Sequence, residues 1–200
     1  MDLIDISTIS AGYPFRGKIS EAVGSDVRVI QMKDIDAGYS VRWDAVIKTQ
    51  LTGRQNPNWL QHGDILFAAR GQRNYAAMID AETNQFNIIA APQFFIIRLN
   101  SANVLPEYLT WFLNQSATQR YFLSNAEGST TPSIRRTVLE ATPLIIPSLA
   151  QQKVIIELAK IIKKEKEIAE KIIGNGERLL QCLLTEMSHK HFNKEDIAQC

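Results

Sequence analysis

The feature that most constrains the fold of this chain is a long amphipathic segment that begins near residue 148. Apolar pairs recur along it at spacings of three, four and seven residues, as far as Leu183-Leu184. These spacings place the pairs on one stripe of a helix, with Lys163 and Glu170 on the other side. Unbroken to about residue 188, the helix would be roughly 60 Å long. The first turns could pack on their own domain, but the rest of the stripe needs a second helix, so we expect a partner.

The apolar stripe also indicates which residues a partner would contact. We expect the contact to involve Ile161, Ile162, Ile168, Ile172, Ile173, Leu179, Leu180 and Leu183.

Two features bear on where this helix begins and whether it continues. Ser148 and Gln151 have the S-x-x-Q spacing of a capping box. Gly174-Asn175-Gly176 interrupts the stripe, and two glycines cost about 2 kcal/mol relative to alanine in a helix interior. We favour a continuous helix because the heptad phase from Ile172 to Leu179 is kept across the glycines. A break into an αα-hairpin is the alternative.

The first 100 residues have a different pattern, in which short apolar runs alternate with turn signals. The spacing of these runs favours a curled, mostly antiparallel sheet or a partial barrel over βαβ units. We expect strands at residues 27–30, 45–47, 64–67, 76–79, 87–89 and 94–99. From Pro106, which suits a first helical position, the apolar spacing predicts a helix to about Leu123.

The fold class that follows is α+β. We expect a curled, mostly antiparallel β domain with short helices over residues 1–147, which would hold the functional loops. A long coiled-coil-type helix should follow over residues 148–190, and a C-terminal tail over residues 191–200.

Composition excludes several classes of protein. The chain is 45% hydrophobic and 22% charged, as globular proteins are. Its longest apolar runs are too short to span a bilayer, and its first residues lack the pattern of a signal peptide. Cys182 and Cys200 suggest neither a disulfide framework nor a metal site, so we expect no metal and a cytoplasmic location. The net charge is +1, so any nucleic-acid surface must be a local patch.

No catalytic motif stands out, and we expect neither catalytic residues nor a cofactor. Asn56-Pro57-Asn58-Trp59 resembles the motif with which amino-methyltransferases grip a flipped base, but its third position differs. No glycine-rich loop would hold a methyl donor, so we expect a turn with Trp59 in the core. Asp64 and Glu82 could imitate the acidic pair of a metal-dependent nuclease. The lysine two residues after the glutamate is missing, however, because position 84 is Asn84.

Polar and cationic residues gather instead in loops. Gln72, Arg73 and Asn74 are residue types that bind base edges. Hydroxyls near residue 130 and the arginines just beyond them suit backbone phosphates. Each alone is an ordinary surface residue, but together they favour duplex DNA. The expected DNA-binding set is Arg42, Lys48, Arg54, Gln72, Arg73, Asn74, Ser129, Thr130, Thr131, Arg135 and Arg136.

Five motifs, in order along the chain, resemble the specificity (S) subunit of type I restriction-modification systems. They begin with an I…G..F segment at residues 4–18 and the GDILFAARG sequence at residues 63–71. LPEYL at residues 105–109, EGSTTPSI at residues 127–134 and PLIIPSLAQQK at residues 143–153 complete the series. Ser148 stands where proline is usual and Gln151 where glutamate is usual, and both still serve helix initiation.

The resemblance implies a non-catalytic target-recognition domain followed by a spacer helix. Its implied partners are double-stranded DNA and the modification (methyltransferase) and restriction subunits, which would carry out methylation and cleavage. Family members typically carry two such units and this sequence has one. A half-size subunit would therefore need to form a homodimer through its helix, with each copy reading one half-site. Whether it is a natural half subunit or part of a longer one stays open. The alternative is a protein-interaction adaptor with the same fold that does not read DNA.

The resemblance also divides the turn at residues 70–74. Asp64 and Gly71 look like framework positions shared across the family. Gln72, Arg73 and Asn74 project from the bend, and there we expect contacts to bases.

Overall fold

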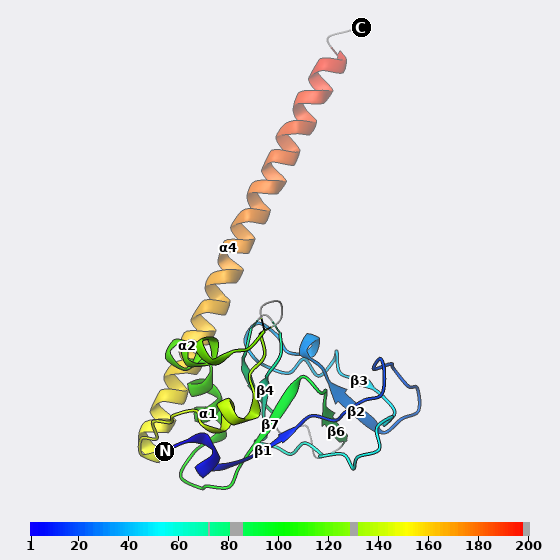
Figure 1. Cartoon of the computed structure of the whole chain (residues 1–200). Helices are drawn as coiled ribbons and strands as arrows, with labels where there is room; N and C mark the ends of the chain where they lie inside the picture. Colours follow the sequence, from blue (N-terminus) through cyan, green and yellow to red (C-terminus); the bar gives the residue numbers. More distant parts are fainter. Residues whose placement is uncertain (72, 81–85, 129–131, 198–200) are drawn as a thin grey trace. The chain divides into compact units, whose positions relative to one another are not determined.

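The computed structural model describes residues 1–200 except 72, 81–85, 129–131 and 198–200, and side chains up to residue 186. The chain divides into two compact units, Met1–Ile156 and Glu157–Cys200. The first unit contains the strands, the short helices and the first turns of the last helix (Figure 1). Among the described residues, no helix is long and apolar enough to cross a membrane.

The strands form two sheets, and most neighbours run antiparallel. The four-stranded sheet is antiparallel throughout, in the order β1 (Ser7–Ala11), β7 (Phe94–Leu99), β4 (Ile65–Ala68) and β5 (Ala76–Met78). The three-stranded sheet has the order β3 (Ile47–Lys48), β2 (Val27–Ile30) and β6 (Asn87–Ala90). In it, β2 pairs antiparallel with β3 and parallel with β6. The α+β class with a mostly antiparallel sheet is therefore confirmed.

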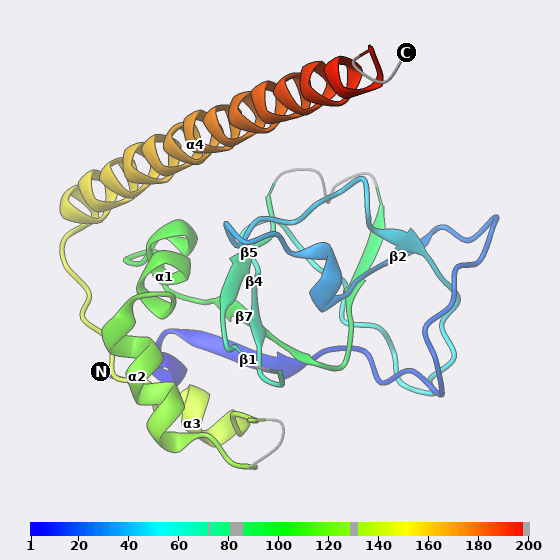
Figure 2. The ribbon, with the colours of Figure 1, turned by 90° about the horizontal axis from the view of Figure 1, so that it is seen from above.

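Two hydrophobic cores lie on opposite faces of the four-stranded sheet. Ile65 and Phe67 of β4 point into the core that the helices cover, and Leu66 and Ala68 point into the core against the second sheet. Figures 1 and 2 show α1 and α2 on one side of this sheet and β2 on the other. Because β4 is buried on both faces, its sequence is an unbroken apolar run.

Short helices cover the first of these cores. They are α1 (Pro106–Leu113), α2 (Ser116–Asn125) and α3 (Arg136–Glu140), with 3-10 turns η1 (Leu3–Asp5) and η2 (Met32–Asp34) elsewhere in the unit. The single helix predicted from Pro106 to about Leu123 is wrong, because the chain breaks at Asn114. The Asn114 amide bonds both backbone groups of Ala76, at 2.9 and 2.8 Å, and so serves as a partner for β5.

The segment around Trp59 also differs from expectation. Trp59 is 36% exposed rather than part of the core, and Leu60 is the residue that packs inside. The backbone carbonyl of Trp59 accepts a hydrogen bond from the Arg98 guanidinium at 3.0 Å, which keeps this segment at the surface.

The last helix, α4 (Leu149–Ile197), is continuous. The predicted capping box is present: the Gln151 side chain accepts the Ser148 amide at 3.1 Å, and the Ser148 hydroxyl accepts the Gln151 amide at 3.4 Å. The helix runs unbroken through Gly174 and Gly176, which confirms the favoured interpretation. At 1.5 Å per residue it is about 74 Å long.

Candidate nucleic-acid interface

The two loops that the sequence singled out lie side by side in the first unit. Arg70 and Ser133 form an antiparallel β-bridge, and a second bridge joins Glu127 to Ser133. On either side of Arg70, the Gly71 amide donates to Pro132 at 3.3 Å and Ala69 accepts the Ile134 amide at 2.8 Å. Backbone bonds thus hold residues 69–71 against residues 132–134.

Gly71 gives the turn its shape. Its φ is +135°, a conformation that side chains rarely adopt, and an added Cβ would lie 2.8 Å from the Met32 Cε atom. Glycine fits this position because of its backbone conformation, whereas the end of the flexible Met32 side chain could move away. This geometry agrees with the framework role expected of Gly71.

Asp64 forms an ion pair with Arg98. Its buried carboxylate accepts two hydrogen bonds from the Arg98 guanidinium, at 2.7 and 2.6 Å, and a third from the Gln61 amide at 2.8 Å. A carboxylate with these partners orders the entry to β4. Glu82, the other member of the acidic pair considered from sequence, lies outside the described residues.

A third segment, residues 31–42, adjoins the same turn. The Met32 side chain faces Gly71, and the Met32 carbonyl accepts the Tyr75 hydroxyl at 3.4 Å. The Arg42 guanidinium donates to the Lys33 carbonyl, which brings two more cations to this region. We call the segments 31–42, 70–74 and 127–135 the loop cluster. Its exposed cationic residues are Lys33, Arg42, Arg70, Arg73 and Arg135.

The predicted base-reading residues of the turn have different surroundings. Arg73 is exposed, whereas Asn74 is partly buried and donates its amide to the Ala68 carbonyl at 2.8 Å, closing the turn. One Asn74 donor is thus already occupied. Gln72, Ser129, Thr130 and Thr131 lie outside the described residues.

Arg135 and Arg136 each hold a surface ion pair. Arg135 pairs with Glu127 at 2.6 Å, and Arg136 pairs with Glu140 of the same short helix at 2.7 Å. Exposed pairs of this kind contribute only about 0–1 kcal/mol, so either guanidinium can exchange its carboxylate for a phosphate at little cost.

Lys48 and Arg54 belong to other parts of the first unit. Lys48 is exposed on β3, opposite Arg28. Arg54 follows Gly53, whose carbonyl accepts the Tyr13 hydroxyl at 3.0 Å, so its loop is held against the segment after β1. These contacts do not join either residue to the loop cluster.

Asp34 places a carboxyl group inside the loop cluster. It is fully buried, and its Oδ2 atom accepts the backbone amide of Gln31 at 2.8 Å. Within the described part of the chain, its Oδ1 atom and the Gln31 Nε2 atom have no hydrogen-bond partner. Burial raises the pKa of Asp34, and neighbouring Lys33 and Arg42 oppose this shift without cancelling it. Burial and the charge of Asp34 together raise the pKa of Tyr75 to about 12, so Tyr75 stays a neutral hydrogen-bond donor.

Tyr39 is a candidate site residue that the sequence did not reveal. It has a φ of +61°, it is 39% exposed, and its ring stacks on Tyr75 with centroids 5.6 Å apart. A left-handed backbone costs a residue with a side chain about 1–2 kcal/mol, and an aromatic pair returns about 0.5–1.5 kcal/mol. The turn signal Asp36-x-Gly38 beside an aromatic residue was the available clue.

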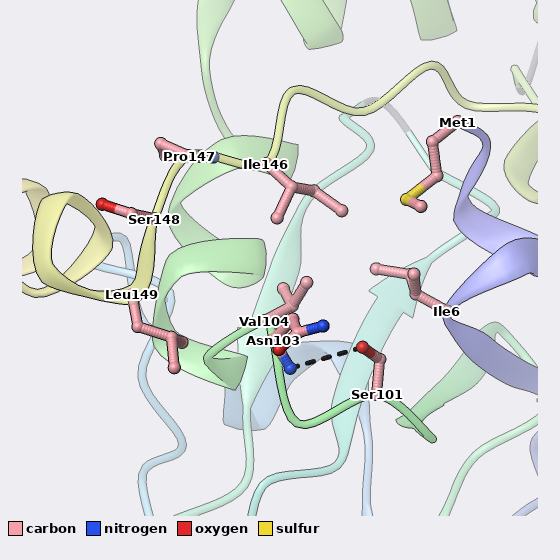
Figure 3. A pocket seen from close by; sticks show the side chains of 9 residues that line it. All are labelled: Met1, Ile6, Ser101, Asn103, Val104, Ile146, Pro147, Ser148 and Leu149. Carbon is pink, nitrogen blue, oxygen red and sulfur yellow. Dashed lines mark hydrogen bonds between the residues drawn. The ribbon is translucent and has the colours of Figure 1, made fainter.

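A shallow cavity of about 390 Å³ lies elsewhere in the first unit (Figure 3). It is lined by Met1, Ile6, Ser101, Asn103, Val104, Ile146, Pro147, Ser148 and Leu149. None of these side chains ionises, and none belongs to the predicted site. Among the described residues, no three side chains that could ligate a metal lie together.

The expected partner residues of α4 are all solvent-exposed. The eight side chains from Ile161 to Leu183 named above are 48 to 66% exposed. On a helical wheel Gly176 lies about 40° from Ile172, within the stripe, whereas Gly174 lies about 160° away on the polar face. The stripe is therefore continuous but uncovered in the single chain.

Comparison with known proteins links this fold to one family. A family model described as "Type I restriction modification DNA specificity domain" matches residues 1–174. No curated protein sequence matches the chain.

Solved structures share the fold at low sequence identity. The HsdS subunit from Thermoanaerobacter tengcongensis matches with a TM-score of 0.57 and 16% identity, over 84% of this chain and 43% of that one. A chain from a structure on the assembly and conformational transition of the type I R-M system matches with a TM-score of 0.60 and 17% identity, over 85% of this chain and 43% of that one. The type-I restriction-modification S subunit from M. genitalium matches with a TM-score of 0.52 and 13% identity, over 84% of this chain and 39% of that one. The chain thus spans about two fifths of the length of these proteins.

Proposed function

The chain belongs to the family of type I restriction modification DNA specificity domains, and from this we propose that it is a sequence-specific DNA-recognition subunit. In this proposal the first unit reads one half of a split site in duplex DNA. The protein docks methyltransferase (modification) subunits and, with them, restriction subunits. Methylation and cleavage are carried out by those subunits, and this chain acts in the cytoplasm without a catalytic residue or cofactor of its own.

The observation that carries the proposal is the loop cluster. Three segments that are distant in sequence meet there, and they carry five exposed cationic residues and two exposed carboxylates, Asp36 and Glu127, in a chain whose net charge is only +1. Arginine side chains bind phosphates and the O6 and N7 edge of guanine bidentately. A local basic patch at the tips of loops, on a rigid sheet framework, suits duplex DNA.

The uncovered stripe of α4 supports the second part of the proposal. Two copies that pair through this stripe carry two recognition units, as reading a split site requires. About 2 kcal/mol of helix propensity is given up at Gly174 and Gly176. Gly176 lies within the stripe, where the absence of a side chain allows the backbone of a second helix to come close.

The role of the loop cluster is tested by removing its arginines. We expect Arg70→Ala together with Arg73→Ala to weaken binding of a preferred duplex by about 100-fold or more, because each arginine that contacts a base contributes about 1–3 kcal/mol. The preferred duplex is selected from a random-sequence pool by the wild-type chain assembled with its modification subunits, and affinity is measured by fluorescence anisotropy.

A matched control removes the same charge from α4. Lys153→Ala with Lys166→Ala should change affinity less than about threefold, because both lysines lie outside the loop cluster. Wild-type DNA affinity in the double arginine variant would contradict the proposal and favour an adaptor that does not read DNA.

A further inference from the structure

Tyr39 has a left-handed backbone conformation that is unfavourable for a tyrosine. Among the described residues it is the one non-glycine residue with a positive φ, +61°. Glycine or asparagine would adopt this conformation with less strain, and Gly38 stands immediately before it. Strain of this kind persists where the surroundings enforce it, and it concentrates at functional sites.

A short hairpin holds Tyr39 at its tip. The Asp36 carboxylate accepts the Gly38 and Ser40 amides, both at 2.8 Å. The Ser40 carbonyl accepts the Asp36 amide at 2.9 Å, and a β-bridge joins Ile35 to Val41. The backbone at residue 39 is therefore fixed before any ligand binds.

The Tyr39 ring is fixed as well. It stacks on Tyr75 at 5.6 Å and an interplanar angle of 21°, and Tyr75 meets the buried Phe94 edge-on at 6.5 Å. Three rings thus run from the core to the surface. The stack covers one face of the Tyr39 ring, and the residue as a whole remains 39% exposed.

The position of this ring indicates its ligand. Tyr75 directly follows the 70–74 turn, and Arg42, three residues after Tyr39, binds the Lys33 carbonyl. The ring presents apolar surface in a loop cluster with five exposed cationic residues and two exposed carboxylates. The Asp36 carboxylate already accepts two backbone amides, and Glu127 pairs with Arg135. Duplex DNA combines the complementary groups, phosphates and the apolar edge of a base.

We propose that Tyr39 is a specificity-determining DNA contact, with its ring packed against the apolar edge of a base in the recognised half-site. The 5-methyl group of thymine is the base substituent with this chemistry. The inference rests on the proposed function and assigns a residue to it.

The test replaces each thymine of the selected duplex by uracil, which removes only the methyl group. For the wild-type chain, assembled with its modification subunits, uracil at one of these positions should lower the affinity about five- to tenfold. Tyr39→Gly should bind the unmodified selected duplex about tenfold more weakly, bind a random duplex as the wild type does, and be insensitive to uracil at that position. Tyr39→Phe should behave as wild type.

Two checks separate this contact from a structural role. Tyr39→Gly relieves the backbone strain, so its circular dichroism spectrum and thermal midpoint should stay close to those of the wild type. Ile4→Ala, which truncates another exposed apolar side chain, should leave DNA binding unchanged.

Equal losses of Tyr39→Gly on selected and random duplexes would overturn the inference, as would wild-type affinity. Wild-type sensitivity to uracil that persists in Tyr39→Gly would also overturn it. If the wild-type complex itself failed to distinguish selected from random duplexes, the proposed function would fail instead.

Discussion

Asp34 carries a carboxyl group that is buried at the base of the Tyr39 hairpin, where its backbone carbonyl accepts the Arg42 amide at 2.8 Å. Burial raises the pKa of this carboxyl, since the charged form loses water and its Oδ1 atom gains no hydrogen bond in return. The folded protein therefore holds the Asp34 proton to a higher pH than the unfolded chain does.

This shift has a definite sign in stability. The contribution of Asp34 is fully present below its unfolded pKa of about 3.9 and is lost as the pH rises through the raised folded pKa. We expect the free energy of unfolding to fall with pH in this window, and the fall to be smaller in Asp34→Asn. Denaturant titrations of both proteins from about pH 4 to 7 measure the difference.

Asp36→Asn is the control, because the Asp36 carboxyl is in the same hairpin but exposed. The free energy of unfolding of the wild type minus that of Asp34→Asn should decrease as the pH rises. A difference that stays constant or increases would contradict the assignment.

The candidate site could be predicted from sequence only where residue type alone pointed to it. Arg73 and Arg135 were chosen because such side chains bind DNA, and the bonds between their loops bring them into one region. Tyr39 was not chosen, because its importance depends on a stack with Tyr75, which is distant in sequence. The DNA contacts themselves remain predictions.

At the scale of elements, the local sequence pattern predicted those strands and helix ends that depend on neighbouring residues in the sequence. The apolar runs gave most of the strands, and a capping box gave the beginning of α4. β1 was missed because its sequence, Ser-Thr-Ile-Ser-Ala, is short and largely polar. The break between α1 and α2 was missed because it depends on bonds from Asn114 to Ala76, in another element.

Gln152 anchors the first turn of α4 within the first unit. It is fully buried, donates to the carbonyls of Asn103 and Pro147 at 2.8 and 2.9 Å, and accepts the Leu105 amide at 2.9 Å. The amide thus fastens the helix to the segment before α1. A buried group with three such bonds is costly to remove.

We expect Gln152→Ala to lower the free energy of unfolding by about 2–4 kcal/mol, because buried backbone groups lose their partners. Lys153→Ala, at the next and exposed position, should change it by less than about 0.5 kcal/mol. Thermal and urea denaturation of the two variants provide the comparison. A Gln152 variant as stable as the lysine variant would show that the anchor is unimportant.

At the scale of the whole molecule, the exposed stripe of α4 predicts a partner. We expect the purified chain to form dimers, and Ile172→Asp with Leu179→Asp to yield monomers, because each buried charge in a helix pair is strongly destabilising. Analytical ultracentrifugation over a range of concentrations gives the mass. Gln181→Asp, on the polar face, is the matched control and should remain dimeric.

Monomeric wild-type protein at all accessible concentrations would contradict a homodimer. In that case we expect a different chain to cover the stripe.

The central claim is that the assembled protein distinguishes DNA sequences. The most direct measurement is the affinity of the chain with its modification subunits for a duplex selected from a random pool and for a scrambled duplex of the same composition. At physiological salt we expect the selected duplex to bind at least about 1,000-fold more tightly. Added salt should weaken both interactions, because phosphate contacts release counterions. Equal affinity for the two duplexes at every salt concentration would contradict the account.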